Sequence, residues 1–306
     1  MDRVLWALGL VAMGACHPSG STGQGPREAT KVVRPDGPLD AEQAGRYMLA
    51  LVNRDRAEQD LPPVEWDEVA ALAGTRHAED MAHRGFTGHW GSDGSVPEQR
   101  YTEGGGDQMV QENAACFFDG TERELSTQPM IDPVELETIQ AAFMGEVPPS
   151  DGHRKNILKS LHTHLGVGVA QPVGHREICV AQEFVDAYGE YSELPKTARP
   201  GQSVEVEGEV HPPMEFGGVG IAQIPLPEPL TVEQLSQRST YPVPPPDRLY
   251  FPKGYKTPKP VKVEDGRFSI SIELGDRSGL CEISVWAKPQ GEEELMPVSI
   301  RTIIAR

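Results

Sequence analysis

The run Ser150-Asp151-Gly152-His153-Arg154-Lys155-Asn156-Ile157-Leu158 carries more information about fold and function than any other stretch of this chain. It follows Pro148-Pro149, which cannot continue a helix, and Glu146 lies just before that break. A chain reversal at the prolines would place Glu146 beside His153. Upstream, Gly88-His89 and Glu112-Asn113 offer a second histidine and a second glutamate. Two imidazoles and two carboxylates that converge bind a divalent metal or move protons.

Composition limits the classes of protein to consider. The chain has 306 residues, which is long enough for two domains with separate cores. Its formal net charge of -18 argues against a nucleic-acid partner, because phosphate binding needs a basic surface. The same charge argues against electrostatic docking on anionic lipid.

The first 16 residues read as a signal rather than as part of the fold. Arg3 precedes an apolar run over residues 4–13, and Gly14-Ala15 stands directly before Cys16. The apolar run is too short to span a bilayer as a helix. Gly-Ala-Cys resembles a bacterial lipobox, which implies that Cys16 is lipidated and becomes the mature N-terminus; the alternative is an ordinary cleaved signal. Residues 17–37 are polar and rich in glycine and proline, as in a flexible tether.

Residues 38–189 show helix signals followed by strand signals. Asp40 with Gln43 predicts a capping box, Asp67 caps a second helix that ends near Gly85, and Asp132-Pro133 starts a third. Ser150 is the expected cap of a fourth, short helix, and Glu146 is expected in the last turn of the third. Strands are expected over residues 112–116, 163–171 and 177–185. Helices packed on a small antiparallel sheet follow from this order.

The order of the motifs resembles a bacterial, SCP-like extracellular member of the CAP superfamily (cysteine-rich secretory proteins, antigen 5 and pathogenesis-related 1 proteins). The resemblance covers about half the chain and implies a secreted three-layer α-β-α sandwich with a central cleft. The motifs are Asn53-Arg54-Asp55-Arg56, Trp66-Asp67, His77-Ala78-Glu79-Asp80-Met81, Gly88-His89, Glu112-Asn113, the run over residues 150–158, Gly166-Val167-Gly168-Val169 and Gln182-Glu183-Phe184.

The resemblance implies a cleft tetrad of His89, Glu112, Glu146 and His153. The sequence departs from the family at Gln111, where a glycine is common. A further departure is an acidic insertion over residues 117–130, which is expected beside the cleft and narrows its mouth.

Three functions are open for the tetrad. A hydrogen-bonded cluster in which each imidazole is held by a carboxylate suits a binding or interaction role. With His89, His153 and Glu112 as ligands of zinc or another divalent cation, the second glutamate would serve as base in a metal-assisted hydrolase acting on peptides. Glu112 and Glu146 are then the catalytic candidates. Lipid or sterol binding is the third function that the resemblance implies, although no apolar stripe singles it out.

Residues 190–306 change character after a linker over residues 193–201. Strands are expected over residues 203–210, 218–224, 268–274, 281–287 and 297–305, and Asp265-Gly266 is a hairpin turn. This spacing predicts an all-β sandwich. Residues 242–260 form either a recognition loop with exposed aromatics or a proline-stiffened surface loop.

Three cysteines follow the lipobox. Cys116 and Cys179 fall in the same predicted domain, so an oxidising envelope allows a bridge between them, and burial as free thiols is the alternative. Cys281 is left over in the second domain.

The sequence therefore predicts an α+β protein in which a CAP sandwich over residues 38–189 precedes a β-sandwich over residues 190–306. It is expected to be secreted across the inner membrane and anchored at the cell envelope by lipid on Cys16. The expected partners are the membrane, through that anchor, and an unknown envelope ligand or protein. No nucleic acid is expected.

Overall fold

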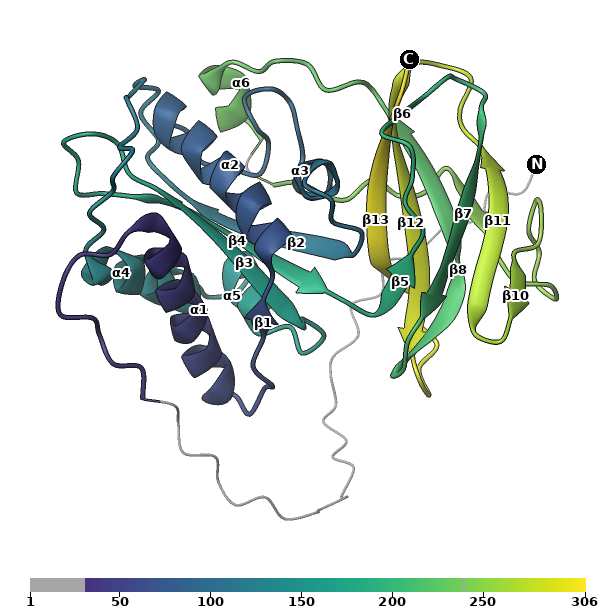
Figure 1. Ribbon diagram of the computed structural model, residues 1–306, viewed down its shortest axis with the longest axis horizontal. Helices are drawn as coiled ribbons and strands as arrows, with labels where there is room; N and C mark the ends of the chain where they lie inside the picture. Colours follow the sequence, from purple (N-terminus) through teal and green to yellow (C-terminus); the bar gives the residue numbers. More distant parts are fainter. Residues whose placement is uncertain (1–30, 239) are drawn as a thin grey trace, which may run out of the picture.

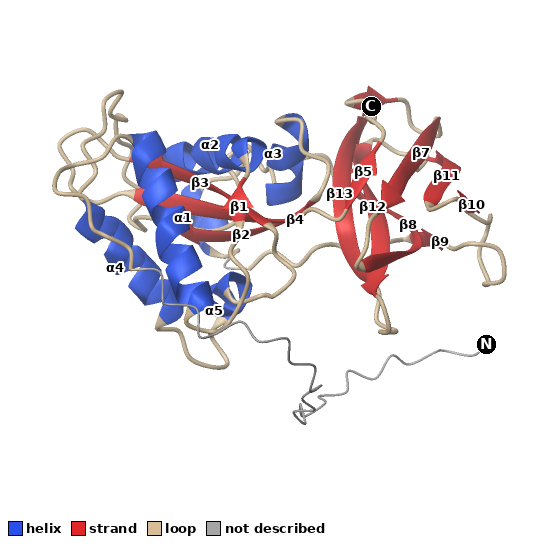
Figure 2. Cartoon of the chain, turned by 60° about the horizontal axis from the view of Figure 1, so that its bottom comes forward, coloured by secondary structure: helices blue, strands red, loops and turns tan. Residues whose placement is uncertain are grey.

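The computed structural model describes residues 31–238 and 240–306 (Figure 1). The lipobox, Cys16 and most of the predicted tether lie outside the described residues. An α/β part comes first along the chain, and a β-sandwich packs against one end of it (Figures 1 and 2). No helix in the described ranges combines the length and apolarity that a bilayer crossing requires.

Five helices belong to the α/β part, and three of them begin where the sequence predicts. Asp40 and Gln43 form the expected capping box, and the side chains of Asp67 and Asp132 accept backbone N–H groups at the starts of their helices. The bounds are α1 Ala41–Ala57, α2 Glu68–Arg84, α3 Pro97–Glu103, α4 Pro133–Met144 and α5 Gly152–Ile157.

The central sheet has four strands in the order β1-β3-β4-β2, so β2 is an edge strand. Only the short β1 pairs in parallel; the other pairs are antiparallel. Helices α2 and α3 cover one face, and α1, α4 and α5 cover the other (Figure 1), which makes three layers. The bounds are β1 Glu65–Trp66, β2 Met109–Ala115, β3 His164–Ala170 and β4 Cys179–Asp186.

The Gly166-Val167-Gly168 motif lets α2 approach β3 closely. A Cβ atom on Gly166 would lie 2.0 Å from the backbone nitrogen of Ala71, and one on Gly168 would lie 2.0 Å from the carbonyl carbon of Gly74. Because only glycine has no side chain to clash, the motif fixes the contact between this layer and the sheet.

Two local predictions are wrong. The N-cap of α5 is Asp151 rather than Ser150, and its side chain makes no capping bond. Helix α4 ends at Met144 with Gly145 as C-cap, so Glu146 lies just beyond the helix and not in its last turn.

Gln111, in the usual glycine position, sits in strand β2 and does not have a positive φ.

The second part of the chain is a sandwich of two sheets with the strand orders β10-β11-β7-β5 and β6-β13-β12-β8-β9. The core between them includes Val206, Ile221, Ile272 and Ile283. Asp265 and Gly266 both have positive φ, 49° and 82°, as the predicted hairpin turn requires. The bounds are β5 Gly189–Tyr191, β6 Thr197–Ala198, β7 Ser203–Val210, β8 Met214–Ile224, β9 Arg248–Tyr250, β10 Lys262–Glu264, β11 Arg267–Glu273, β12 Gly279–Pro289 and β13 Met296–Ala305.

Between β8 and β9 the chain leaves the sandwich and returns to the α/β part. We call the described residues 225–238 and 240–247 the strap; it contains a short helix, α6 Val232–Ser236, that the sequence did not predict. In Figure 1, α6 lies beside α2. The Leu235 side chain is buried in the core cluster that contains Met81 and Phe86. The strap is therefore packed on the α/β part.

Candidate functional site

A cavity of about 790 Å³ opens in the α/β part of the molecule, and we call it the cleft. All four residues of the predicted tetrad, His89, Glu112, Glu146 and His153, line it. They come from different elements: the loop after α2, strand β2, the segment after α4 and the first turn of α5. Two histidine–glutamate pairs result, one near each helical layer.

The first pair joins His89 to Glu112. His89 Nδ1 donates to Glu112 Oε1 over 2.9 Å, and Arg100 Nη2 donates to Glu112 Oε2 over 2.6 Å. The Arg100 guanidinium also donates to the carbonyl oxygens of His89, over 3.2 Å, and Ser95, over 3.1 Å. Because the Arg100 and Glu112 side chains are each only 1% exposed, this is a buried ion pair that also holds the His89 backbone.

His77 lies behind this pair on α2. Its Nε2 donates to the carbonyl oxygen of Gly88 over 2.7 Å and lies 3.6 Å from Glu112 Oε1. Burial, reinforced by repulsion from Arg100, lowers the pKa of His77 to about 4, so the imidazole is neutral at pH 7. Burial alone would raise the pKa of Glu112, but the Arg100 guanidinium and the hydrogen bond from His89 outweigh it and hold that pKa well below its usual range. Glu112 is thus an ionised carboxylate.

The second pair joins His153 to Glu146. His153 Nδ1 donates to Glu146 Oε1 over 2.5 Å, and the backbone N–H groups of His153 and Arg154 donate to Glu146 Oε2 over 2.9 and 3.3 Å. The ring of Phe143, at the end of α4, lies 4.5 Å from the His153 ring between centroids. The Glu146 carboxylate therefore acts as the cap of α5 and fixes the orientation of the imidazole.

Both imidazoles use Nδ1 on a carboxylate and leave Nε2 for whatever enters the cleft. In the neutral tautomer that nitrogen carries a lone pair, suited to accept a hydrogen bond or to bind a metal. Within residues 31–238 and 240–306, no three His, Cys, Asp or Glu side chains are grouped as metal ligands. A zinc site of His89, His153 and Glu112 stays a prediction, and Glu112 would have to give up a present partner to join it.

A second buried carboxyl lies next to Glu112. Glu183 stands opposite Glu112 in the β2–β4 register, and neither of its oxygens has a hydrogen-bond partner in the part of the chain that the structure describes. Burial, and then the charge of Glu112, raises the pKa of Glu183 well above its usual range, which favours the protonated acid. Sequence reasoning did not assign it to the site, although the Gln182-Glu183-Phe184 motif contains it.

The third wall of the cleft comes from the strap, through Thr240, Tyr241 and Val243. The Tyr241 hydroxyl donates to the Glu98 carboxylate, and its ring packs edge-on against Trp90 at 5.2 Å between centroids. Thr240 and Tyr241, just before the predicted aromatic loop, and Val243 at its start thus border the cleft, whereas Tyr255 within that loop is 70% exposed.

The acidic insertion over residues 117–130 does not contribute to the cleft, contrary to expectation. It packs beyond the C-terminal end of α2, where the backbone N–H groups of Asp119 and Gly120 donate to the carbonyl oxygen of Gly85. Arg123 pairs with Asp119 inside the insertion itself.

A disulfide joins Cys116, directly after β2, to Cys179, the first residue of β4. This is the bridge that the sequence left open against two free thiols. Cys281 is buried as a free thiol, in the core of the sandwich.

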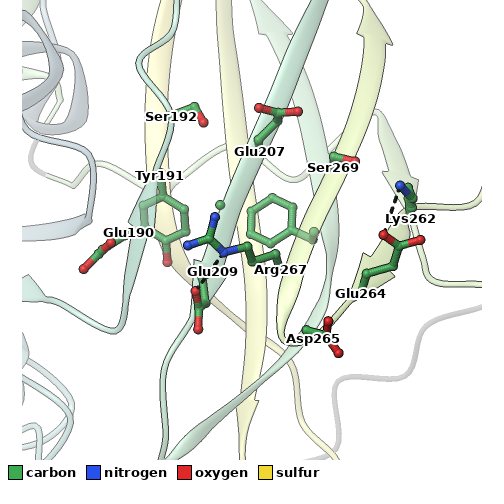
Figure 3. Close-up of a pocket in the computed structure, with 12 residues that line it drawn as sticks. Glu190, Tyr191, Ser192, Glu207, Glu209, Lys262, Glu264, Asp265, Arg267 and Ser269 are labelled. Atoms are coloured by element: carbon green, nitrogen blue, oxygen red, sulfur yellow. Dashed lines mark ion pairs between the residues drawn. The ribbon is translucent and has the colours of Figure 1, made fainter.

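Another cavity, of about 680 Å³, lies on the sandwich over β5, β7, β10 and β11 (Figure 3). Four of its charged side chains form two ion pairs, Arg267 with Glu209 at 3.3 Å and Lys262 with Glu264 at 3.1 Å. The remaining charged side chains of its lining, Glu190, Glu207 and Asp265, are all acidic.

Comparison with known proteins agrees with the geometry of the α/β part. Residues 49–184 match the profile of the cysteine-rich secretory protein family, CAP. The chain contains a CAP domain. The sandwich that follows it lies outside the matched residues.

The chain also matches individual proteins. The uncharacterised membrane protein YlbC of Bacillus subtilis (strain 168) is 32% identical over 126 residues, which is 40% of this chain and 31% of YlbC, so the match spans about a third of that relative. An extracellular protein of Bacillus anthracis with an SCP domain has a TM-score of 0.37 and 24% identity over 48% of this chain and 41% of its own. An outer surface protein of Borrelia burgdorferi has a TM-score of 0.34 and 14% identity over 49% of this chain and 99% of its own.

Proposed function

We propose that this protein is an extracytoplasmic, envelope-anchored binding protein whose CAP cleft holds a polar ligand through Nε2 of His89 and of His153. One observation carries the proposal: each carboxylate of the tetrad is already bonded to Nδ1 of an imidazole. Carboxylates used in this way orient the two rings and leave two fixed nitrogens in a cavity of ligand size.

The metal-assisted hydrolase has less support from the same contacts. Glu112 is ion-paired with the buried Arg100, and its depressed pKa makes it a weak base at neutral pH. Glu146 accepts one imidazole and two backbone N–H groups. A general base needs a free oxygen that faces the reacting water, and both carboxylates already have partners.

Three observations support a location outside the cytoplasm. The Cys116–Cys179 bridge suits an oxidising compartment, the sequence before Cys16 resembles a lipobox, and a relative of the CAP domain is described as a membrane protein. Expression of Cys16→Ala in a bacterial host, followed by membrane fractionation, tests the anchor. We expect the variant to move to the soluble extracytoplasmic fraction, and unchanged membrane association would overturn the lipid anchor.

The cleft is tested by NMR of the labelled histidine rings in the full mature chain. The probes are a random peptide mixture, soluble peptidoglycan fragments and zinc chloride, each added alone. We expect an organic probe to shift the ring signals of His89 and His153 without being cleaved. His175, which is 39% exposed at a hairpin turn, serves as the control ring and should not move.

The outcomes separate the candidate functions. Shifts by zinc alone, accompanied by cleavage of the peptide mixture, would overturn the binding role in favour of the hydrolase. His89→Ala and His153→Ala should each abolish the response to the organic probe. A response that survives both substitutions would place the ligand elsewhere on the molecule.

A further inference from the structure

The cleft runs along the free edge of strand β2, and we propose that its ligand is an extended peptide that pairs with this edge as an additional strand. The inference rests on the proposed binding function and names the chemical class of the ligand. It assigns recognition to the backbone of residues 110–113 as well as to the two imidazoles.

The lining of the cleft shows where it runs. Four consecutive residues of β2, residues 110–113, all contribute to it. Successive side chains of a strand point to opposite faces of the sheet. Val110 packs with Tyr101 and Glu112 binds Arg100 in one layer, whereas Asn113 binds the His153 carbonyl oxygen in the other. A cavity that touches both faces of one strand must follow the edge of that strand.

The backbone at this edge is unpaired. Strand β2 pairs with β4 from Met109 to Ala115 and forms the end of its sheet. Within the described residues, no hydrogen bond reaches the backbone of residues 109–115 from the side opposite β4. The nearest backbone bond there runs from Ile300 N to Gln108 O, at 3.5 Å, just before the strand begins. Free N–H and C=O groups along an edge are a template for strand addition.

The walls of the cleft favour a single extended chain over a second copy of the protein. His89 and α3 flank the edge on one side, His153 and Lys159 flank it on the other, and Tyr241 of the strap closes the third. The strap packs closely on the α/β part at Gly94. A Cβ atom on this glycine would lie 2.4 Å from the carbonyl oxygen of Glu228, which belongs to the strap. The sheet of a second copy cannot reach the edge of β2 inside such walls, but a single peptide can lie between the walls.

The same walls indicate which residues of the protein would contact the side chains of the peptide. Alternate residues of an added strand would point toward His89 and Tyr241, and the residues between them toward His153 and Lys159. The net charge of -18 on the chain disfavours an acidic peptide. We therefore expect neutral or basic peptides.

The test begins with a random peptide display library selected on the full mature chain. A recovered peptide is then resynthesised with one backbone N-methyl group at a time, and each version is titrated by calorimetry. N-methylation removes one donor and leaves the side chain intact. Strand pairing predicts that affinity falls about tenfold at alternate positions and changes little at the positions between them.

Protein variants provide a second measurement. Tyr241→Ala should weaken the peptide about tenfold, and the matched control Tyr255→Ala, in the exposed loop, should leave the affinity unchanged. Only every second residue of an edge strand points its N–H away from the neighbouring strand, so bound peptide should also slow amide hydrogen exchange at alternate residues within 110–113.

The possible failures are distinguishable. If no peptide is recovered but peptidoglycan fragments shift the His89 and His153 rings, the inference is overturned and the proposed function stands. A peptide that binds without the alternating pattern, or with no protection of residues 110–113, overturns edge pairing alone. Dimers whose interface protects the same amides would identify a second copy as the occupant. If no organic probe acts on the cleft, the inference and the proposed function fail together.

Discussion

Arg100 is the residue on which the His89–Glu112 half of the cleft depends. Its guanidinium pairs with Glu112 and holds the carbonyl oxygens of His89 and Ser95, all with a side chain that is 1% exposed. A guanidinium presents several donors in a rigid plane, so one side chain bonds the carboxylate and the loop together. The orientation of His89 therefore depends on a residue that does not line the cleft.

We expect Arg100→Met to lower the free energy of unfolding by about 3–5 kcal/mol, because the substitution leaves the Glu112 carboxylate buried without its cation. Urea unfolding followed by tryptophan fluorescence measures the change. Arg84→Met is the control: Arg84 is 44% exposed and lies 3.5 Å from Asp80, so its loss should change stability by less than about 1 kcal/mol. Equal effects of the two substitutions would show that the Arg100 pair is not a buried ion pair in solution.

At this scale, the sequence identified the four residues of the tetrad, and it missed Arg100, which lies in no family motif, and Glu183, which lies in one. His89, Glu112 and His153 occur in the ordered motifs, Glu146 lies shortly before the run over residues 150–158, and all four line one cleft. Arg100 stands in a run, Pro97-Glu98-Gln99-Arg100, whose charges read as a solvated surface. Whether an arginine side chain is buried depends on the residues that pack over it, and no local sequence pattern encodes that packing.

Strand β2 is the element that unites the site, since it supplies Glu112 and the edge of the cleft. Its end is tied to β4 by the Cys116–Cys179 bridge, which closes a loop with a sequence separation of 63 residues. Ala115 and Val180 are register partners one step inside the bridge, so the disulfide continues the pairing of the two strands.

Replacing both cysteines, as Cys116→Ala with Cys179→Ala, should lower the free energy of unfolding by about 4 kcal/mol, because a loop of this length gains that much entropy in the unfolded chain. The measurement is urea unfolding with and without dithiothreitol. Reductant should destabilise the natural protein and leave the double variant unaffected. A reductant effect of the same size in both proteins would mean that the bridge is not formed. Cys281→Ala is the control for a cysteine outside the bridge.

Three of the helices that the sequence predicted have a capping residue and a long period, whereas the six-residue α5 was expected from Ser150, which does not cap it. Helices α1, α2 and α4 begin at a capping residue and extend over 17, 17 and 12 residues. Helices α3 and α6 have seven and five residues, too few for an apolar repeat to become visible. Strand β11 was recognisable because its residues alternate between exposed and buried.

At the scale of the whole molecule, the sandwich is coupled to the CAP domain and is not a separate appendage. Strand β13 packs against α3 and β2, with Thr302 N donating to Thr102 Oγ1 over 3.3 Å. The expected linker over residues 193–201 contains strand β6 of the sandwich. Neither the return of the strap nor this packing is visible in the sequence, because a proline-rich segment does not encode which surface it will cover.

A cluster of ionisable groups is buried where the parts meet. Glu98 of α3 accepts the Tyr241 hydroxyl of the strap, and Glu282 of β12 lies beside them, 2% exposed. Burial, and then the neighbouring Glu98 carboxyl, raises the pKa of Glu282 to about 9. Burial also raises the pKa of Glu98. Folding at neutral pH therefore takes up a proton at this junction.

The sign of the pH dependence follows from these raised pKa values. An unfolded glutamate has a pKa of about 4.3, so between about pH 4.3 and pH 9 the folded state binds more protons than the unfolded state. The contribution of Glu282 to stability is fully present below that range and is lost as the pH rises through it. Above about pH 9 both states are ionised and the contribution becomes constant.

Glu282→Gln keeps the shape of the side chain and removes the proton that must be taken up. We expect the free energy of unfolding of the natural protein to fall relative to the variant by up to about 1.4 kcal/mol per pH unit between pH 5 and pH 9. Urea unfolding at a series of pH values measures the difference, and Glu273→Gln, at an exposed position of β11, should reproduce the natural pH dependence. If Glu282→Gln and the natural protein change in parallel with pH, the Glu282 carboxyl is ionised in the folded protein and the junction opens to water. If they diverge as expected, the protonated Glu282 carboxyl stabilises the folded protein, and that contribution is lost as the pH rises.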